Sequence, residues 1–163
     1  MTRSHAREIA VHMIFALSFG DFEAEELIQQ QLDPERFKEL APDMPLYSQY
    51  PNEKQEKYIA ELVRGTFAHG PELDDYIARY AKNWTFARIP RMAAAIMRTA
   101  MYEVLYMPDI PNAVAVNEAL EIAKNYEAQE VVSFMNGVLG TFVRTEFPDT
   151  PAKPEKKADE AEG

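Results

Sequence analysis

The sequence predicts an all-α fold of two small packed helical bundles. Apolar residues recur at spacings of three and four along most of the 163-residue chain, which is the period of helices with one buried face. No segment alternates apolar and polar residues as a half-buried strand does, and no unit repeats with a period of about 20–50 residues. The apolar fraction of 47% is enough to build a sizeable core.

About seven helices are expected in the whole chain. In the N-terminal half they are at 4–18, 22–32 and 52–69, with a short additional helix at 35–40. Gly20 ends the first of them and Pro34 follows the second. The short additional helix lies within a proline-rich loop that runs from 33 to 51. The helix at 52–69 has an inward stripe that includes Phe67, and Gly70-Pro71 is expected to terminate it.

Four more helices are expected in the C-terminal half, at 72–82, 89–106, 112–126 and 130–146. Residues Asn83 to Thr85 form a joint after the first of them, so we predict an N-terminal sub-bundle of 1–82 and a C-terminal sub-bundle of 83–147. The tail, 148–163, holds no large apolar residue and is expected to be disordered.

Composition argues against several classes of protein. The chain has no cysteine, which excludes disulfides and thiolate metal sites and fits a reducing cytoplasm. It has no run of about 18 apolar residues, and we expect neither a membrane contact nor a secretory signal. Glycine-rich phosphate loops and the common hydrolase motifs are also absent. We therefore expect a cytoplasmic protein that is not an enzyme and uses no cofactor or metal.

The three histidines are scattered. His5 can share a helix side with Glu8 or His12, as two metal ligands would, but solvated polar residues on a helix explain the same spacing and are the interpretation that we favour.

Charge is distributed unevenly along the chain. The net charge of −10 argues against a free-standing nucleic-acid binder, because affinity for phosphate comes from clustered cations. Two zones are nevertheless locally basic. One lies within the first twelve residues, which hold Arg3, His5, Arg7 and His12 against Glu8, and the other is the acid-free segment 79–98.

The start of the first helix is one candidate site for a ligand that carries phosphate. Arg3, Arg7, Val11 and Phe15 are spaced by four and therefore share one helix face. Cations in a first helical turn oppose the helix dipole at a cost of about 0.3–1 kcal/mol each, and a phosphate ligand would explain their presence. The alternative is that two arginines stand near a helix start by chance.

Segment 79–98 is a second candidate. Its cations are interleaved with Tyr80, Trp84 and Phe86, and aromatic residues among cations can bind single-stranded RNA. The alternative is that Tyr80 belongs to the core, that Trp84 fills the joint, and that the cations are simply solvated. In the last helix, Gly137 and Gly140 suggest the close approach of a ligand or of another helix, because glycine weakens a helix by about 1 kcal/mol.

Four segments of the chain resemble one known family. They are A-R-E-I-A-V-H-M-I-F at 6–15, I-M-R-T-A-M-Y-E-V at 96–104, I-P-N-A-V-A-V-N-E-A-L-E-I-A-K-N-Y at 110–126 and F-M-N-G-V-L at 134–139. Together they are similar to the NusB family of bacterial transcription antitermination factors. The resemblance implies a fold of two helical bundles. It also implies binding of boxA-type RNA together with the ribosomal protein NusE, in a complex with other Nus factors on RNA polymerase during ribosomal RNA transcription.

The resemblance also implies site residues. The RNA-binding residues would be Arg3, Ser4, His5, Arg7, Phe15, Tyr126, Gln129, Glu130, Ser133 and Phe134. The partner interface would include Arg88, Arg91, Ala93, Asn117, Glu118 and Glu121. The chain departs from the family pattern at three positions. Relatives often carry an acidic residue where this chain has Ala93, a lysine where it has Ser133, and an acidic residue where it has Gly140.

Two other functions stay open at this point. The chain could be a detached substrate-binding module, similar to the N-terminal domain of ribosomal RNA cytosine methyltransferases. It could also be a helical protein-interaction module, such as a homodimer, that does not bind RNA.

Overall fold

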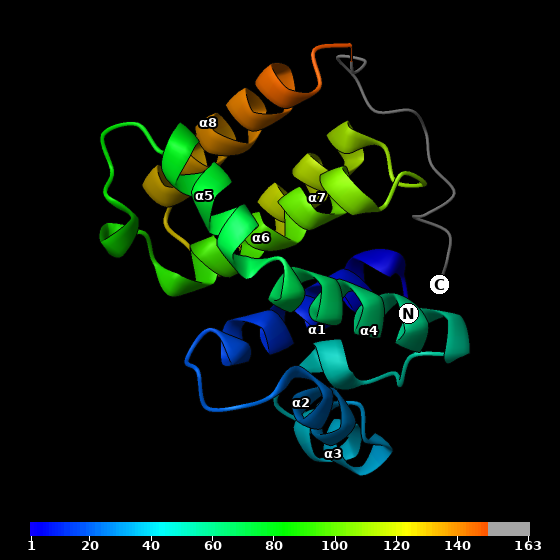
Figure 1. The fold of residues 1–163 in the computed structure, drawn as a ribbon. Coiled ribbons are helices and arrows are strands. Elements are labelled where there is room, and N and C mark those ends of the chain that lie inside the picture. Colours follow the sequence, from blue (N-terminus) through cyan, green and yellow to red (C-terminus); the bar gives the residue numbers. More distant parts are fainter. Residues whose placement is uncertain (150–163) are drawn as a thin grey trace. The chain divides into compact units, whose positions relative to one another are not determined.

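The computed structural model describes residues 1–149, which form eight α-helices, two short 3-10 helices and no strand (Figure 1). The predicted all-α class is confirmed. No helix in this part of the chain is long and apolar enough to cross a membrane. Disorder was predicted for residues 148–163, and residues 150–163 lie outside the described part of the chain.

The chain divides into two compact units, one of residues 1–67 and one that begins at Ala68. The first unit contains α1 (Arg3–Leu17), α2 (Ala24–Gln31), α3 (Pro34–Leu40), the 3-10 helix η1 (Pro45–Tyr47) and α4 (Glu53–Ala68), the last residue of which already belongs to the second unit. These bounds agree with the predicted helices to within a few residues.

Local signals explain where the helices of the first unit begin and end. The Thr2 hydroxyl accepts a hydrogen bond from the backbone N–H of His5 at 3.1 Å, which caps α1, and Gly20 ends that helix region with a φ of 82°. Asn52 and Gln55 bond reciprocally at the start of α4, where each side-chain oxygen accepts from the other's backbone N–H, at 2.8 and 2.9 Å.

The proline-rich segment 33–51 is anchored by aromatic side chains. The ring of Phe37 meets those of Tyr47 and Tyr50 edge to face, with centroids 4.9 and 5.0 Å away. The Tyr50 hydroxyl lies 2.7 Å from the backbone oxygen of Leu32 and 2.8 Å from the Glu56 carboxylate. These contacts hold the two short helices of this segment and the loops around them against the end of α2 and the start of α4.

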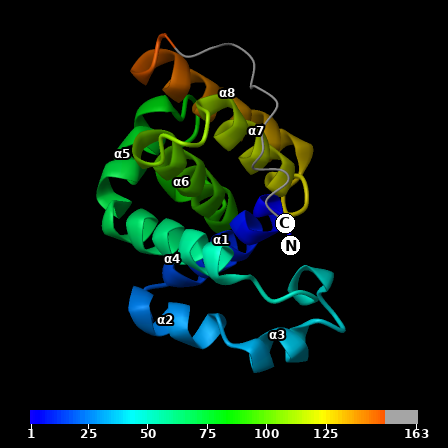
Figure 2. The same cartoon turned by 90° about the vertical axis from the view of Figure 1, so that its right-hand side faces the viewer.

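The second unit is built around α6. It contains α5 (Gly70–Tyr80), the 3-10 helix η2 (Phe86–Arg88), α6 (Arg91–Tyr106), α7 (Asn112–Ala123) and α8 (Gln129–Glu146). Helix α6 lies between α5 and α7, and α8 packs against all three (Figures 1 and 2). Four alanines of α6 are buried, and their small side chains let the neighbouring helices approach closely: Ala93, Ala94, Ala95 and Ala100.

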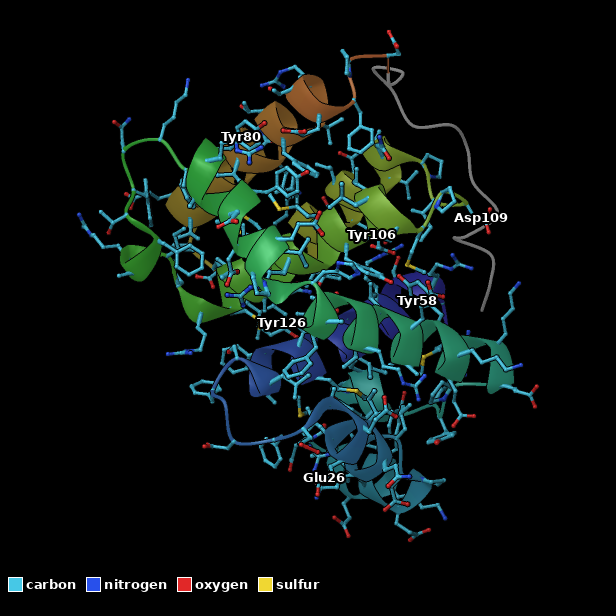
Figure 3. The ribbon with its side chains drawn as sticks, in the orientation of Figure 1. Glu26, Tyr58, Tyr80, Tyr106, Asp109 and Tyr126 are labelled. Carbon is cyan, nitrogen blue, oxygen red and sulfur yellow. The ribbon has the colours of Figure 1, made fainter. Side chains whose placement is uncertain are left out.

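Polar contacts tie α5 to the second unit. Arg98 of α6 donates from Nε to Asp74 at 2.6 Å, and the Tyr106 hydroxyl donates to Glu72 at 2.6 Å. Figure 3 labels Tyr106 and Tyr80, the two tyrosines in the polar contacts of α5. The hydrogen bond to Glu72 raises the pKa of Tyr106 to about 12. At the other end of α5, Tyr80 bonds Glu146 of α8. The division after Phe67 therefore lies earlier than the predicted one at 82 and 83.

Two local expectations differ from the structure. Helix α4 ends at Ala68, just before Gly70-Pro71 as expected, but these two residues also form the start of α5, which was predicted to begin at 72. Proline fits a first helical turn because its missing N–H needs no partner there. Phe67, expected on the inner stripe of its helix, is 51% exposed, because it lies at the last turn of α4, beyond the buried Leu62, Val63 and Thr66.

The burial of Phe142 gives a test of this core. Its ring has no exposed surface and meets the rings of Tyr76, Tyr80 and Phe147 edge to face. We expect Phe142→Ala to lower the free energy of unfolding by about 3–5 kcal/mol, measured by urea denaturation. Phe67→Ala, which removes the same ring from an exposed position, should change it by about 0.5 kcal/mol or less. Equal losses in the two variants would contradict this packing.

Candidate nucleic-acid interface

The first turn of α1 brings several of the predicted RNA-binding residues together. Arg3 and Ser4 are half-buried and His5 is exposed. The Arg3 guanidinium lies 4.9 Å from the centre of the Tyr58 ring, and that of Arg7 lies 5.8 Å from it. Tyr58 of α4 therefore lies against both cations.

Arg7 is fully buried, which conflicts with its predicted direct contact with RNA. The predicted face of Arg3, Arg7, Val11 and Phe15 is likewise not a surface, because Val11 is also buried. Helix α1 is buried around most of its circumference, so residues spaced by four from Arg3 turn into the protein. In this structure Arg3 and His5 offer cationic or polar groups to a ligand at this end of α1, and Arg7 does not.

Phe15 lies near the opposite end of α1 and is half-buried. Its ring meets that of Phe19 edge to face at 5.1 Å, and Phe19 is 52% exposed. The pair forms an apolar surface at the end of α1.

His12 serves the structure of the first unit. Its Nδ1 lies 2.7 Å from the Tyr47 hydroxyl, and the two rings lie 5.9 Å apart. Burial lowers the pKa of His12 below its usual value, although the Glu8 carboxylate acts in the opposite direction. Burial also raises the pKa of Tyr47 to about 12. Within residues 1–149, no group of three or more His, Cys, Asp or Glu side chains is arranged to hold a metal ion.

The second group of predicted RNA-binding residues lies around the start of α8. Gln129, Glu130 and Ser133 are exposed along its first turns, and Tyr126, just beyond the end of α7, is 38% exposed. Glu130 lies in the first turn of α8, where the helix dipole stabilises a carboxylate. Phe134 is half-buried because another ring covers it.

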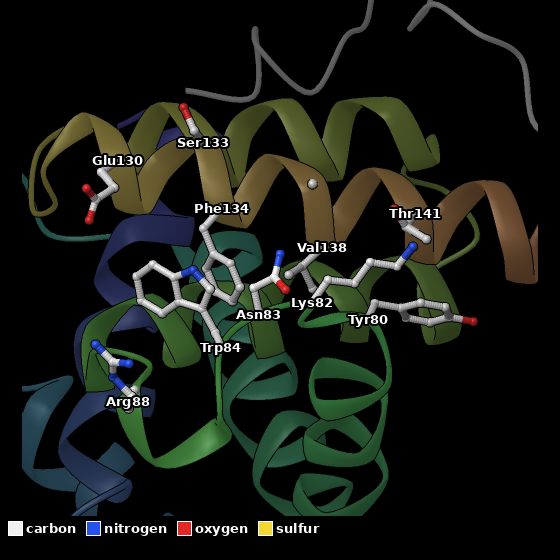
Figure 4. Close-up of a pocket in the computed structure, with 11 residues that line it drawn as sticks. Tyr80, Lys82, Asn83, Trp84, Arg88, Glu130, Ser133, Phe134, Val138 and Thr141 are labelled. Carbon is white, nitrogen blue, oxygen red and sulfur yellow. The ribbon is translucent and has the colours of Figure 1, made fainter.

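That other ring is Trp84. The indole stacks on Phe134 with centroids 4.3 Å apart and an interplanar angle of 21°. The two rings line a hollow of about 560 Å³ between α8 and the segment that joins α5 to α6 (Figure 4). Lys82, Asn83 and Arg88 line it from that segment, and Ser133, Gly137 and Thr141 from α8.

The sequence predicted only part of the hollow. The cations interleaved with aromatic residues and the glycines of the last helix indicated a ligand site, but no spacing in the sequence indicates that Trp84 contacts Phe134. Trp84 does fill the joint, and it also lines the hollow. A Cβ on Gly137 would meet nothing within 4 Å, so no other helix approaches it, and a Cβ on Gly140 would meet only the Arg144 side chain.

The predicted partner residues lie on η2, α6 and α7. Arg88, Arg91, Asn117 and Glu121 are exposed, and Glu118 is half-buried. Glu121 pairs with Lys124 at 2.6 Å on the same helix. Ala93 has no exposed surface, because α6 is enclosed by its neighbours, and it therefore cannot touch a partner directly.

Comparison with known proteins identifies close similarity over most of the chain. A family model described as the NusB family matches residues 4–144. The transcription antitermination protein NusB of Acetivibrio thermocellus is 37% identical over 148 residues, which cover 90% of this chain and 92% of that protein. NusB of Symbiobacterium thermophilum is 34% identical over 144 residues, covering 88% and 90%. A solved structure of T. maritima NusB is similar with a TM-score of 0.74 and 26% identity, covering 89% and 92%.

The environment of His12 predicts how stability depends on pH. Its pKa is lowered in the folded protein, so below the unfolded value of about 6.5 the unfolded chain binds more protons. Stability from this group is therefore present near neutral pH and is lost as the pH falls. We expect the stability advantage of the wild type over His12→Gln, from urea denaturation, to be larger at pH 7 than at pH 5.

His5→Gln is the matched control, because it removes an exposed histidine from the same helix. An advantage over His12→Gln that grows toward pH 5 would contradict the burial of a neutral His12.

Proposed function

Because this chain belongs to the NusB family, we propose that it binds boxA-type RNA together with the ribosomal protein NusE. The chain is a transcription antitermination protein, and proteins of this family are not enzymes. The complex would join other Nus factors on RNA polymerase in the bacterial cytoplasm and act during ribosomal RNA transcription.

The family match across residues 4–144 carries this proposal, because it includes every residue expected to bind RNA except Arg3 and every residue expected at the partner interface. Exposure supports it. Tyr126, Gln129, Glu130 and Ser133 lie at the surface around the start of α8, and the first turn of α1 exposes His5. These side chains can stack on bases or hydrogen-bond with them, as single-stranded RNA requires.

Charge supports the need for a second protein. With a net charge of −10 and Arg7 buried, the chain offers RNA few surface cations near α1. Affinity for RNA depends strongly on cations that replace the counterions of phosphate. A basic partner would supply them, and the acidic side chains Glu118 and Glu121 of α7 are complementary in charge to such a partner.

Titration of boxA-type RNA gives the direct test. We expect weak binding by this chain alone and tighter binding with NusE, with an affinity that falls steeply between about 50 and 200 mM salt. Fluorescence anisotropy of labelled RNA measures both. If NusE produced no gain in affinity, the proposal would fail, and a helical interaction module or a detached substrate-binding module would remain.

Two arginine variants separate contact with RNA from support of the fold. Arg3→Ala should weaken RNA binding several-fold and leave the urea midpoint nearly unchanged, because Arg3 is half-buried at the start of α1. Arg7→Ala should instead lower the free energy of unfolding by about 1–3 kcal/mol, because Arg7 is fully buried beside Tyr58 and the substitution removes its contacts there.

Lys57→Ala removes an exposed cation of α4 and is the control for a general effect of charge. A stable Arg7→Ala protein with specifically reduced RNA affinity would show that Arg7 reaches RNA after all.

A further inference from the structure

The hollow beside Trp84 has the chemistry of a site for one nucleotide. We infer that it binds a base of single-stranded RNA between α8 and the segment 82–88, as an additional contact of the RNA-binding role proposed above, on which this inference rests. Its volume of about 560 Å³ lies within the range of roughly 300–1,000 Å³ typical of small-molecule sites.

The indole of Trp84 provides the stacking surface. Phe134 covers one face of the indole, with ring centroids 4.3 Å apart. Trp84 is half-buried and lines the hollow, so the part of the indole that faces the hollow is available for a stacking base. The Phe134 ring behind it fixes the indole plane, which lowers the entropy cost of ordering the site on binding. Base stacking on an aromatic side chain tolerates any sequence, because every base has a π face.

Lys82 and Arg88 provide cations for the phosphate. Both are exposed, and within the described residues neither side chain makes a hydrogen bond or an ion pair. They flank Trp84 in the sequence, within a segment that has no acid between 79 and 98. Unpaired cations beside an open aromatic ring favour an anionic, aromatic ligand over an apolar peptide.

Polar groups around the hollow can recognise the base and the ribose. The Asn83 amide, the Ser133 and Thr141 hydroxyls and the Glu130 carboxylate all line it. Glu130 is the one acid in this lining, and a carboxylate accepts hydrogen bonds from exocyclic amines such as N4 of cytosine. The Thr141 hydroxyl accepts from Arg144 at 3.3 Å and still has a proton to donate.

Backbone geometry leaves room for the ligand. Gly137 lines the hollow from α8, and a Cβ atom placed on it would contact no other atom within 4 Å. Asn83 has a φ of 67° and is the one non-glycine residue with positive φ in the described part of the chain, and this turns the segment between Lys82 and Trp84 sharply. Figure 4 shows Lys82 and Arg88 on opposite sides of the stacked rings.

The tryptophan supplies its own readout, because Trp84 is the sole tryptophan of the chain. The intrinsic fluorescence of the full chain would be titrated with single-stranded RNA of about ten nucleotides, and in a second arm with AMP or CMP. In parallel, anisotropy of labelled RNA reports binding anywhere on the protein. We expect quenching of Trp84 at the RNA concentrations that raise the anisotropy. Quenching by mononucleotides at similar concentrations would identify a free nucleotide as the ligand instead.

Variants decide whether the quenching comes from this hollow. Trp84→Ala should weaken RNA binding on the order of tenfold. Lys82→Ala with Arg88→Ala should weaken it several-fold and lower the salt slope by about 0.7 for each phosphate that these cations neutralise. The matched control is the double variant Lys38→Ala with Lys57→Ala, which removes two exposed cations from the first unit. This control should change the RNA affinity and the salt slope less than the double variant of Lys82 and Arg88 does.

The outcomes separate this inference from the proposed function. RNA binding that leaves Trp84 fluorescence unchanged and is insensitive to the three substitutions overturns the nucleotide site and leaves the proposed function intact. Quenching of Trp84 by NusE but not by RNA overturns the nucleotide site and indicates a protein-docking site, which agrees with the expected place of Arg88 at the partner interface. Absence of RNA binding in both readouts, with and without NusE, removes the proposed function and this inference with it.

Discussion

The close packing of α6 is the constraint on which the C-terminal unit depends. Eleven of its sixteen residues are buried, and the alanines at 93–95 and 100 let α5, α7 and α8 approach it closely. Helix α6 therefore exposes mainly its two ends, at Arg91 and Tyr106. Most other accessible polar and aromatic groups of this unit lie on the segments around it, namely the joint before α6 and the exposed sides of α7 and α8.

Helix α5 fixes where that joint begins. It is held to α6 by Asp74–Arg98 and Glu72–Tyr106, and to α8 by Tyr80–Glu146. Both ends of the helix are thus tied to the same unit, so the segment after Tyr80 starts from a fixed point. From there the chain places Trp84 on Phe134, and the hollow results from this placement and from the bare backbone at Gly137.

Helical periodicity predicted the fold class and the longer α-helices, because one apolar face per helix is a local property of the sequence. Periodicity could not predict which residues of other helices cover each helix face. Arg7 is polar, yet it is buried beside Tyr58 of another helix, and Phe67 is apolar, yet its side chain is exposed. The stack of Trp84 on Phe134 is likewise a contact between distant segments. Family motifs led to Phe134, but its neighbour came only from the structure.

Phe134 belongs to two surfaces at once. It is one of the residues expected to meet RNA at the start of α8, and it is also the ring on which Trp84 rests. A ligand that moved Phe134 from one side would change the support of the indole on the other. Under the two proposals above, occupancy of the two surfaces would therefore be energetically coupled, and the coupling would be reciprocal: whatever factor the first ligand applies to the affinity of the second, the second applies to the first.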